Sequence, residues 1–448
     1  MSRLKEIATE LVEVARSAGA DDAVAEVYDG SVDQIRYSNS MIDTSNYWKS
    51  ENAHVFVAVE GRTMASDLRD LRLARKAVPE MVKSARASPV NEDYKGIAKG
   101  RFRYSRGRVD KRITSIRDPA RYVHEAIGAA TANGAADVGG TLFVRRSEWC
   151  IASTGGALAE DANASIDLSV RAFSQPESSG QAVLVTANLD KMKAAATGER
   201  AAEFAAAAKD PVQGETGKFD LIMEPLFLGG IVGATGAMAS ALAVELGMSM
   251  FAKKMGKRVA SGSVSMIDDP TLKTMSRRAF DHEGRPTRKN VVIKDGVLKT
   301  FLHNTSTAKR FKARPTASTG PLVATLFSTP SEPVMFHPVL SKGDQSVDEL
   351  IEDVRDGFYM NNTWYTRFQN YSTGDFSTIP RDAILRIRNG EIVGSVKNIR
   401  VSDNLMTFWK NIDALSRSSE EIYWWDEAAP PADLPAARAR KMTITRSS

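Results

Sequence analysis

The feature that most limits the fold is a run of twenty residues without a charge, residues 225–244. Such a run is long enough to cross a bilayer as a helix. Its composition argues against that role, because it is rich in glycine, alanine and hydroxyl side chains and is bordered by Glu224 and Glu245. Small side chains let a helix pack closely against a sheet. We therefore expect a buried central helix that follows a strand at residues 219–223.

The overall composition is that of a soluble globular protein. The chain has 448 residues, of which 42% are hydrophobic and 26% charged, enough for two domains with sizeable cores. A net charge of +5 is too small to predict nucleic-acid binding. The single cysteine, Cys150, excludes an internal disulfide and is expected to be a buried small hydrophobic residue. Because the first residues predict an amphipathic helix and not a signal peptide, we expect a cytoplasmic protein.

The hydrophobic patterns predict an α+β protein in two parts. Residues 1–212 alternate helices (4–18, 71–85) with strands (23–28, 34–42) and a hairpin at Glu60 and Gly61, which is typical of an N-terminal α/β sandwich-like domain. Residues 213–448 are dominated by strands, with hairpin turns at Asp295-Gly296 and Asn389-Gly390. This pattern favours a C-terminal, strongly curved, barrel-like and mostly antiparallel β domain around the central helix.

Several further boundaries follow from local signals. Asp118 and Pro119 predict a helix start, an alanine-rich helix is expected over 190–209, and another helix over 405–415. Ser346 and Glu349 form a capping box that predicts a short helix over 346–354. The last eight residues, 441–448, are expected to be a strand.

A basic segment runs from Lys95 to Arg117 and holds nine Lys or Arg residues against one acid, Asp110, with Phe102 and Tyr104 between them. Basic residues interleaved with aromatic ones are typical of a nucleic-acid strip. A solvated connector is the favoured interpretation, and a surface for an acidic partner is a third.

The five histidines lack the local spacing of a metal site. They are His54, His124, His282, His303 and His337, and no two of them lie at ligand spacing on one helix. His282, between Asp281 and Glu283, is expected to be an exposed turn residue. A relocated metal site built from His282, His303 or His337 with nearby acids remains an alternative.

Six segments in the same order resemble one known family. They are the central helix, MIDDP (266–270), FDHEGRPTR (280–288), TGDFS (373–377), RNGEIV (388–393) and DNLMTFWKNIDAL (403–415). The sequence resembles the TldD/TldE (PmbA) family of metallopeptidase-related proteins. In the catalytic TldD branch, the resemblance implies H-E-x-x-x-H on the central helix, with two histidines that hold zinc and a glutamate that acts as general base.

In this chain that motif aligns with VGATGA, so Val232 and Ala237 replace the histidines and Gly233 replaces the glutamate. The zinc-binding cysteine near the C-terminus of the catalytic branch is also missing from residues 424–448. The pattern therefore resembles TldE, although Asp403 stands where glycine is usual in TldE-like sequences. No metal or catalytic residue is expected in this chain.

The resemblance implies a dimer of related subunits that encloses a chamber, with zinc in a TldD-like partner and short or unfolded peptides as substrates. This chain would be a non-catalytic subunit that forms part of the wall. Candidate contacts with peptide or partner are Asp268, Asp269, Asp281, His282 and Glu283, with hairpin turn chemistry as the alternative. A stand-alone homodimeric protein that binds peptides or another ligand is the main alternative function.

Overall fold

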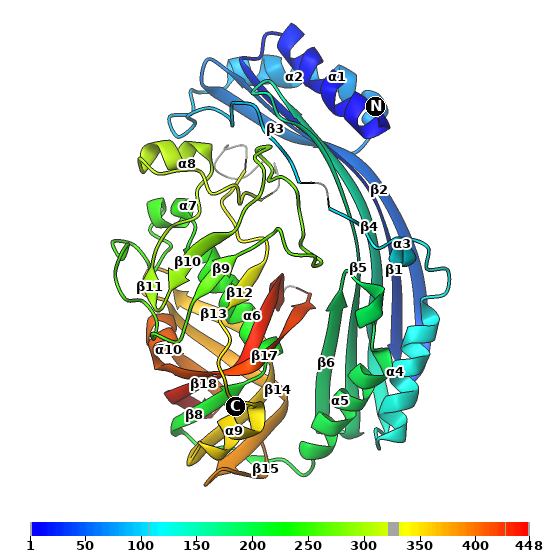
Figure 1. Cartoon of the computed structure of the whole chain (residues 1–448), viewed down its shortest axis with the longest axis vertical. Helices are drawn as coiled ribbons and strands as arrows, with labels where there is room; N and C mark the ends of the chain where they lie inside the picture. Colours follow the sequence, from blue (N-terminus) through cyan, green and yellow to red (C-terminus); the bar gives the residue numbers. More distant parts are fainter. Residues whose placement is uncertain (1, 106, 321–330, 426, 447–448) are drawn as a thin grey trace.

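The computed structural model describes residues 2–105, 107–320, 331–425 and 427–446. It contains a tall curved sheet from the first half of the chain and a second, strongly curved sheet from the second half (Figure 1). The predicted α+β fold is confirmed. The boundary between residues 212 and 213 stays a prediction.

The N-terminal sheet has six antiparallel strands in the order β3-β2-β1-β4-β5-β6. Their bounds are β1 (Asp22–Ser38), β2 (Met41–Val59), β3 (Arg62–Leu68), β4 (Asp137–Ser153), β5 (Leu158–Gln175) and β6 (Ser178–Thr186). The prediction of separate strands at 23–28 and 34–42 is wrong, because β1 is continuous and the chain reverses after it at Asn39 and Ser40, both with positive φ. β1 pairs with β2 and β4 along almost all of its length, so the backbone N–H and C=O groups of its polar middle have strand partners.

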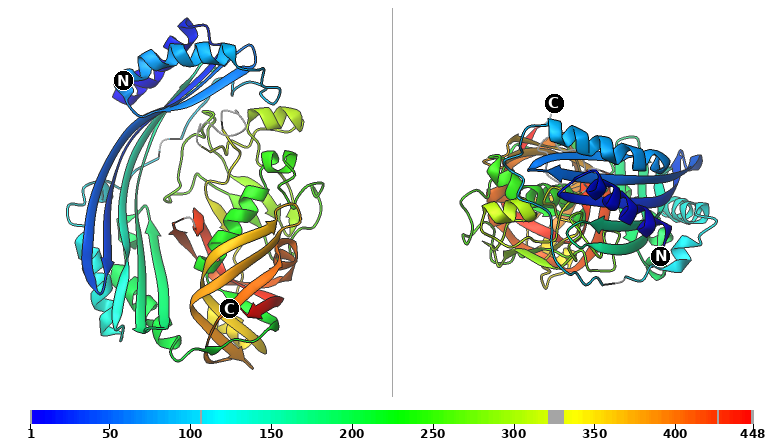
Figure 2. Two further views of the ribbon diagram at one scale, coloured as in Figure 1. Left: turned by 180° about the vertical axis from the view of Figure 1, so that it is seen from behind. Right: turned by 90° about the horizontal axis from the view of Figure 1, so that it is seen from above.

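Helices cover the convex face of this sheet (Figures 1 and 2). The two ends of this face carry separate cores, one under α1 (Arg3–Ser17) and α2 (Leu71–Ala87) and one under α4 (Ala120–Ala132) and α5 (Ala194–Ala207). The helices predicted over 4–18 and 71–85 are confirmed.

Two predicted helix starts are wrong. Pro119 takes the N-cap position of α4 and Asp118 makes no cap. The alanine-rich segment begins with a single 3-10 turn, η1 (Leu189–Lys191), because the Asn188 side chain accepts the N–H of Asp190, and α5 starts only at Ala194.

The C-terminal sheet has twelve strands around the central helix (Figure 2). Its main order is β11-β10-β9-β12-β18-β8-β13-β14-β15-β7, and β16 pairs with both β14 and β18. That pairing closes a ring of strands, so the predicted barrel-like curvature is confirmed. The bounds are β7 (Val212–Gln213), β8 (Gly217–Met223), β9 (Met266–Asp268), β10 (Asn290–Lys294), β11 (Val297–Leu298), β12 (Pro338–Leu340), β13 (Asp356–Asn370), β14 (Asp375–Arg388), β15 (Glu391–Lys397), β16 (Ile399–Asn404), β17 (Ile412–Trp424) and β18 (Ala428–Arg446).

Short helices connect these strands, namely α8 (Thr305–Arg310), α9 (Val347–Glu352) and α10 (Leu405–Asn411), whereas the short helix α3 (Lys111–Thr114) lies between α2 and α4 in the N-terminal half. The capping box of α9 and the turns at Glu60, Asp295 and Asn389 are confirmed. The helix predicted over 405–415 ends early, at Asn411, because β17 begins there. The predicted last strand is part of a much longer one, β18, which starts at Ala428.

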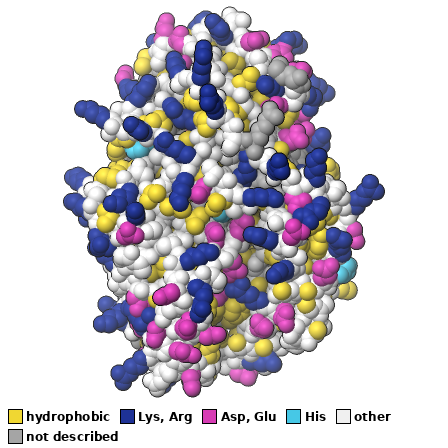
Figure 3. Space-filling model, viewed as in Figure 1, with side chains coloured by type: hydrophobic (Ala, Val, Ile, Leu, Met, Phe, Trp, Pro, Cys, Tyr) yellow, Lys and Arg dark blue, Asp and Glu magenta, His cyan; other side chains and the backbone are white. Residues whose placement is uncertain are grey.

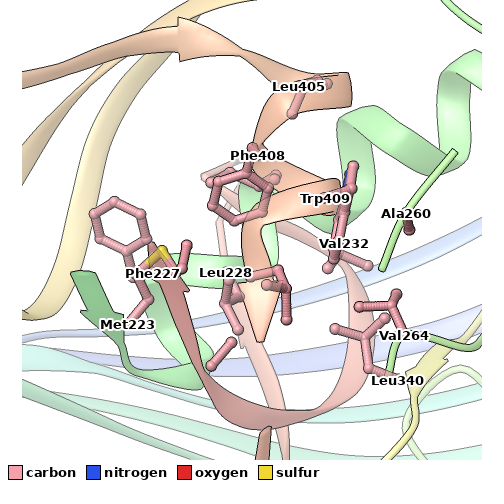
Figure 4. Packing of buried hydrophobic residues seen from close by; sticks show 14 of the residues in the cluster. Met223, Phe227, Leu228, Val232, Ala260, Val264, Leu340, Leu405, Phe408 and Trp409 are labelled. Atoms are coloured by element: carbon pink, nitrogen blue, oxygen red, sulfur yellow. The ribbon is translucent and has the colours of Figure 1, made fainter. Parts of the chain in front are cut away.

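The uncharged run forms two helices, α6 (Pro225–Met238) and α7 (Ala241–Glu245), with a break at Ala239 and Ser240. Figure 4 shows Phe227, Leu228 and Val232 of α6 packed with Phe408 and Trp409 of α10. Within the described ranges, no helix is long and apolar enough to span a membrane.

Candidate functional site

The helix positions aligned with the zinc motif lie against β18. Three glycines on one side of α6, Gly229, Gly230 and Gly233, let the helix backbone approach the start of that strand. A Cβ atom built on Gly233 would overlap the carbonyl oxygen of Ala429 and lie 3.1 Å from its carbonyl carbon. A glutamate side chain therefore has no space at this position unless β18 moves.

The two positions aligned with histidines differ in burial, since Val232 is buried and Ala237 is exposed, and both carry aliphatic side chains. Val232 is fully buried in the core around α6 (Figure 4). Ala237 lines a cavity of about 280 Å³ whose walls are mostly apolar and include Leu242, Leu246 and Met248. Aliphatic side chains offer no electron pair to a metal ion. The residues that the resemblance aligns with the zinc site therefore do not fit a zinc ion.

Asp268 and Asp269 both bind neighbouring backbone. Asp268 is fully buried, and its Oδ1 accepts the N–H groups of Phe336 and His337, each at 2.9 Å, while the Ser318 hydroxyl donates to Oδ2. Asp269 accepts the N–H of Thr271 at 3.2 Å and its hydroxyl at 2.5 Å. The bonds of Asp268 hold β9 beside the chain that leads into β12, and those of Asp269 fix the turn that follows β9.

Asp281 and Glu283 fix a buried turn. Asp281 accepts the N–H groups of Glu283 at 3.1 Å and Arg285 at 2.8 Å. Glu283 accepts the N–H of Thr305 at 2.9 Å and its hydroxyl at 2.7 Å, at the start of α8. Burial raises the pKa of Asp281 to about 6, and burial together with the charge of Asp281 raises that of Glu283 to about 7. Both carboxyl groups have structural partners; their predicted contacts with peptide or partner stay predictions.

His282 lies in a buried network and is not the exposed turn residue expected, since only 4% of it is exposed. Its Nε2 lies 2.8 Å from the Arg278 guanidinium, and its Nδ1 lies 2.7 Å from Glu26 Oε2. A guanidinium can only donate, so Nε2 accepts and a neutral imidazole carries its proton on Nδ1, beside Glu26. Burial lowers the pKa of His282, which favours this neutral form. Because Nε2 accepts from Arg278 and Nδ1 carries the proton, neutral His282 has no free lone pair to act as a base.

The network joins the two sheets. Glu26 comes from β1, Arg278 also bonds Glu26 at 3.1 Å, and its guanidinium lies 4.8 Å from the ring centroid of Trp149 on β4. Burial of Glu26 opposes its ionisation, but His282 and Arg278 outweigh burial and lower its pKa to about 2. A cavity of about 680 Å³ opens beside these residues, and Asn52, His54 and Asp67 also line it.

The remaining histidines named for a relocated metal site are buried, and each faces a hydroxyl side chain. His303 faces Thr307, with 3.3 Å between Nδ1 and the hydroxyl, and burial lowers its pKa to about 4. His337 faces Ser276 at 3.3 Å. Among the residues that the structure describes, no group of three or more His, Cys, Asp or Glu side chains is placed to hold a metal ion.

A second charged cluster, at Glu224, was not predicted. The acid that borders the uncharged run is 4% exposed and contacts the Arg200 guanidinium and the Tyr359 hydroxyl, while Arg200 also bonds Glu420 at 2.8 Å. Burial raises the pKa of Glu224. The cluster ties α5 to the start of α6. The only sequence signal for this charged cluster was an acid beside a long apolar run.

Cys150 and the basic segment take structural positions. Cys150 is fully buried, as predicted, and burial raises the pKa of its thiol to about 12, so it is not a nucleophile at neutral pH. Tyr104 donates to the Gly284 carbonyl at 2.7 Å, and Lys99 pairs with Asp22 at 3.0 Å. The face in Figure 3 carries basic and acidic side chains interspersed, without a continuous basic patch. A nucleic-acid strip between Lys95 and Arg117 stays an untested alternative.

Comparison with known proteins gives a consistent picture. Residues 216–446 match the sequence model of the PmbA/TldA metallopeptidase C-terminal domain. A metalloprotease of Methanothermobacter thermautotrophicus is 31% identical over 224 residues, which cover 49% of this chain and 46% of that protein. A metalloprotease of Methanocaldococcus jannaschii is 31% identical over 216 residues, 46% of this chain and 44% of that protein. Each match spans less than half the length of these curated relatives.

The fold as a whole matches a solved structure. The crystal structure of TldE from Thermococcus kodakarensis superposes with a TM-score of 0.87 and covers 98% of this chain and 100% of that one. The sequence identity is 17%, so this likeness shows the fold alone.

Proposed function

Because the chain belongs to the TldD/TldE (PmbA) metallopeptidase-related family, we propose that it is the non-catalytic subunit of a TldD/TldE-type zinc metallopeptidase complex. The complex would degrade or process short or unfolded peptides, with zinc in a TldD-like partner. The observation that carries this proposal is the packing of Gly233 on Ala429, which leaves no room for the general base that the catalytic branch places there. Val232 and Ala237 add two positions without metal ligands.

The part of this chain in such a complex would be to shape the chamber. The concave face of the N-terminal sheet is polar and aromatic: Arg145 pairs with Asp167 at 2.8 Å and stacks on Phe143, and Tyr28 lies beside Trp149. Polar and aromatic side chains can bind an extended peptide, because they contact both the polar backbone and the apolar side chains of that peptide. The concave face therefore supports a role in peptide binding without chemistry of its own.

The experiment compares the chain alone with the chain expressed together with an H-E-x-x-x-H homologue from the same genome. We expect the chain alone to hold zinc at or below adventitious levels and to cleave no unfolded peptide. We expect the co-purified complex to cleave and to hold zinc. As control, a complex whose partner carries Gln in place of the motif glutamate should assemble and be inactive. Peptide cleavage by this chain alone, or failure to associate with the homologue, would refute the proposal.

A stand-alone homodimeric protein that binds peptides or another ligand is the second candidate. The cavity of about 680 Å³ beside Glu26, Arg278 and His282 favours it, because a ligand there would meet both charges and the Trp149 ring. Gel filtration of a cell extract separates the two candidates, since only the first predicts that this chain elutes with a zinc-bearing homologue.

A further inference from the structure

The two sheets meet at a cavity of about 330 Å³. Its walls come from β5 and β6 of the N-terminal sheet and from β14 and β15 of the C-terminal sheet (Figure 1). Its volume lies at the lower end of the range of ligand sites, which often form where two structural units join. The cavity is separate from the one beside Glu26 and from the helix positions aligned with the zinc motif.

The described lining of this cavity has one positive charge in excess. It contains three cations, Arg171, Arg381 and Lys397, and two acids, Glu177 and Asp382. Lys397 and Glu177 pair with each other at 2.7 Å, and both side chains are exposed to solvent, by 38% and 67%. Asp382 is therefore the one remaining acid of the described lining for two arginines.

Asp382 is fully engaged by other groups. Its Oδ1 accepts hydrogen bonds from Arg171 Nε at 2.6 Å and from the Ser179 hydroxyl at 2.8 Å. Its Oδ2 accepts the Asn362 amide at 3.3 Å. Asp382 has a φ of +63° and lies where the register between β13 and β14 shifts. Such bulges change the direction of neighbouring side chains, and here Asp382 is directed to Arg171 while the preceding residue, Arg381, has no share in the carboxylate.

Arg381 has no anionic partner. Its partly buried guanidinium forms no hydrogen bond and no ion pair with any group in the described part of the chain, and it lies 3.9 Å from the centroid of the Trp364 ring. A ring contact uses the face of a guanidinium and leaves the N–H groups in its plane free. Burial and the nearby charge of Arg171 lower the pKa of Arg381 to about 10, so it is still protonated at neutral pH. A partly buried cation with unpaired donors is unfavourable unless a partner binds it.

We propose that this cavity binds a small oxyanion, a carboxylate or a phosphate, through the guanidinium of Arg381, with Arg171 and Lys397 adding to the positive field. Guanidinium groups bind both kinds of oxyanion through paired N–H donors. The anion would supply the negative charge that the lining lacks and would bridge the two sheets. The proposal goes beyond the proposed function, because it requires neither zinc nor a catalytic partner and is tested on this chain alone.

Isothermal titration of the full-length chain tests the site with two probes, inorganic phosphate and N-acetylalanine. The neutral amide of N-acetylalanine is the control for the carboxylate. We expect one phosphate or one N-acetylalanine to bind per chain and the amide not to bind; the probe that binds identifies the kind of oxyanion. No binding of either anion means that water alone solvates Arg381, and it overturns the proposal.

Substitutions assign the binding to Arg381. Arg381→Gln should weaken binding of the anion at least about tenfold, because it removes charge-assisted hydrogen bonds. Arg367→Gln is the matched control and should leave the affinity unchanged: Arg367 also lies 3.9 Å from an aromatic ring centroid, that of Tyr365, but it is exposed and outside the cavity lining. Equal affinities of the parent and Arg381→Gln overturn the proposal.

Thermal unfolding gives a second readout that does not depend on a titration signal. Without added anion, Arg381→Gln should be no less stable than the parent, because it removes a charge that has no counter-ion. At constant ionic strength, phosphate or N-acetylalanine should raise the Tm of the parent more than that of Arg381→Gln, since a ligand stabilises only the fold that binds it. An equal rise in both proteins is a general effect of the salt and overturns the proposal.

Discussion

The contact between α6 and β18 gives a sharp test of the packing argument. The substitution Gly233→Ala adds one methyl group to a helix residue whose Cβ would overlap the Ala429 carbonyl oxygen. The obstruction is backbone, at the start of a strand that pairs there with β17, so it cannot rotate away as a side chain would. Pro430 Cδ lies 3.5 Å from the same Cβ and limits sideways movement of the new methyl group.

The size of the effect follows from two opposing terms. Overpacking a well-packed core costs about 1–3 kcal/mol and sometimes more. Replacing glycine by alanine inside a helix stabilises the helix by up to about 1 kcal/mol. Because the overlap is with backbone, we expect the overpacking cost to be at the upper end, and a net loss of about 2–3 kcal/mol. For a cooperative unit of about 150–250 residues this is a fall in Tm of roughly 4–12 °C.

Scanning calorimetry of the purified chain measures the shift, and Gly128→Ala is the matched control. Gly128 lies inside α4, and a Cβ there has no heavy atom within 4 Å. This control should stabilise the protein slightly, by about 0.5–1 kcal/mol. Gly233→Ala could instead be as stable as the parent, or gain stability as Gly128→Ala does. In that case β18 moves aside at little cost, and position 233 has room for a catalytic side chain.

Two further predictions concern the buried charges. Arg278→Met leaves Glu26 without its cation in a buried site and should cost about 3–5 kcal/mol in urea unfolding. Lys83→Met, which breaks an exposed pair with Glu80 on α2, should leave the midpoint unchanged, and equal effects of the two substitutions would contradict the assignment. Glu283 has a folded pKa of about 7 against an ordinary 4.5, so its protonated form stabilises the fold. That contribution is complete below about pH 4.5 and is lost as the pH rises through 7. The unfolding midpoint of the parent chain should therefore fall over this range relative to that of Glu283→Gln, and parallel pH profiles would contradict this prediction.

Local sequence signals predicted what local physics controls. The turns at Glu60, Asp295 and Asn389 each place a residue with positive φ before glycine, and that preference needs no tertiary contact. The amphipathic stripes of α1 and α2 likewise predicted their buried faces. β18 was missed, apart from its end, because its prolines and alanines show no strand alternation, and its conformation comes from pairing with β8, β16 and β17.

The same distinction between local sequence signals and tertiary contacts holds for the candidate site. The sequence by itself determined that Val232, Gly233 and Ala237 bear no metal ligand or base, because side-chain chemistry is fixed by residue type. Only the tertiary structure decided that Gly233 closes on Ala429, and that His282 meets Glu26, more than two hundred residues away in the chain. Such contacts arise when separate strands pack together, and the spacing of residues along one strand or helix does not encode them.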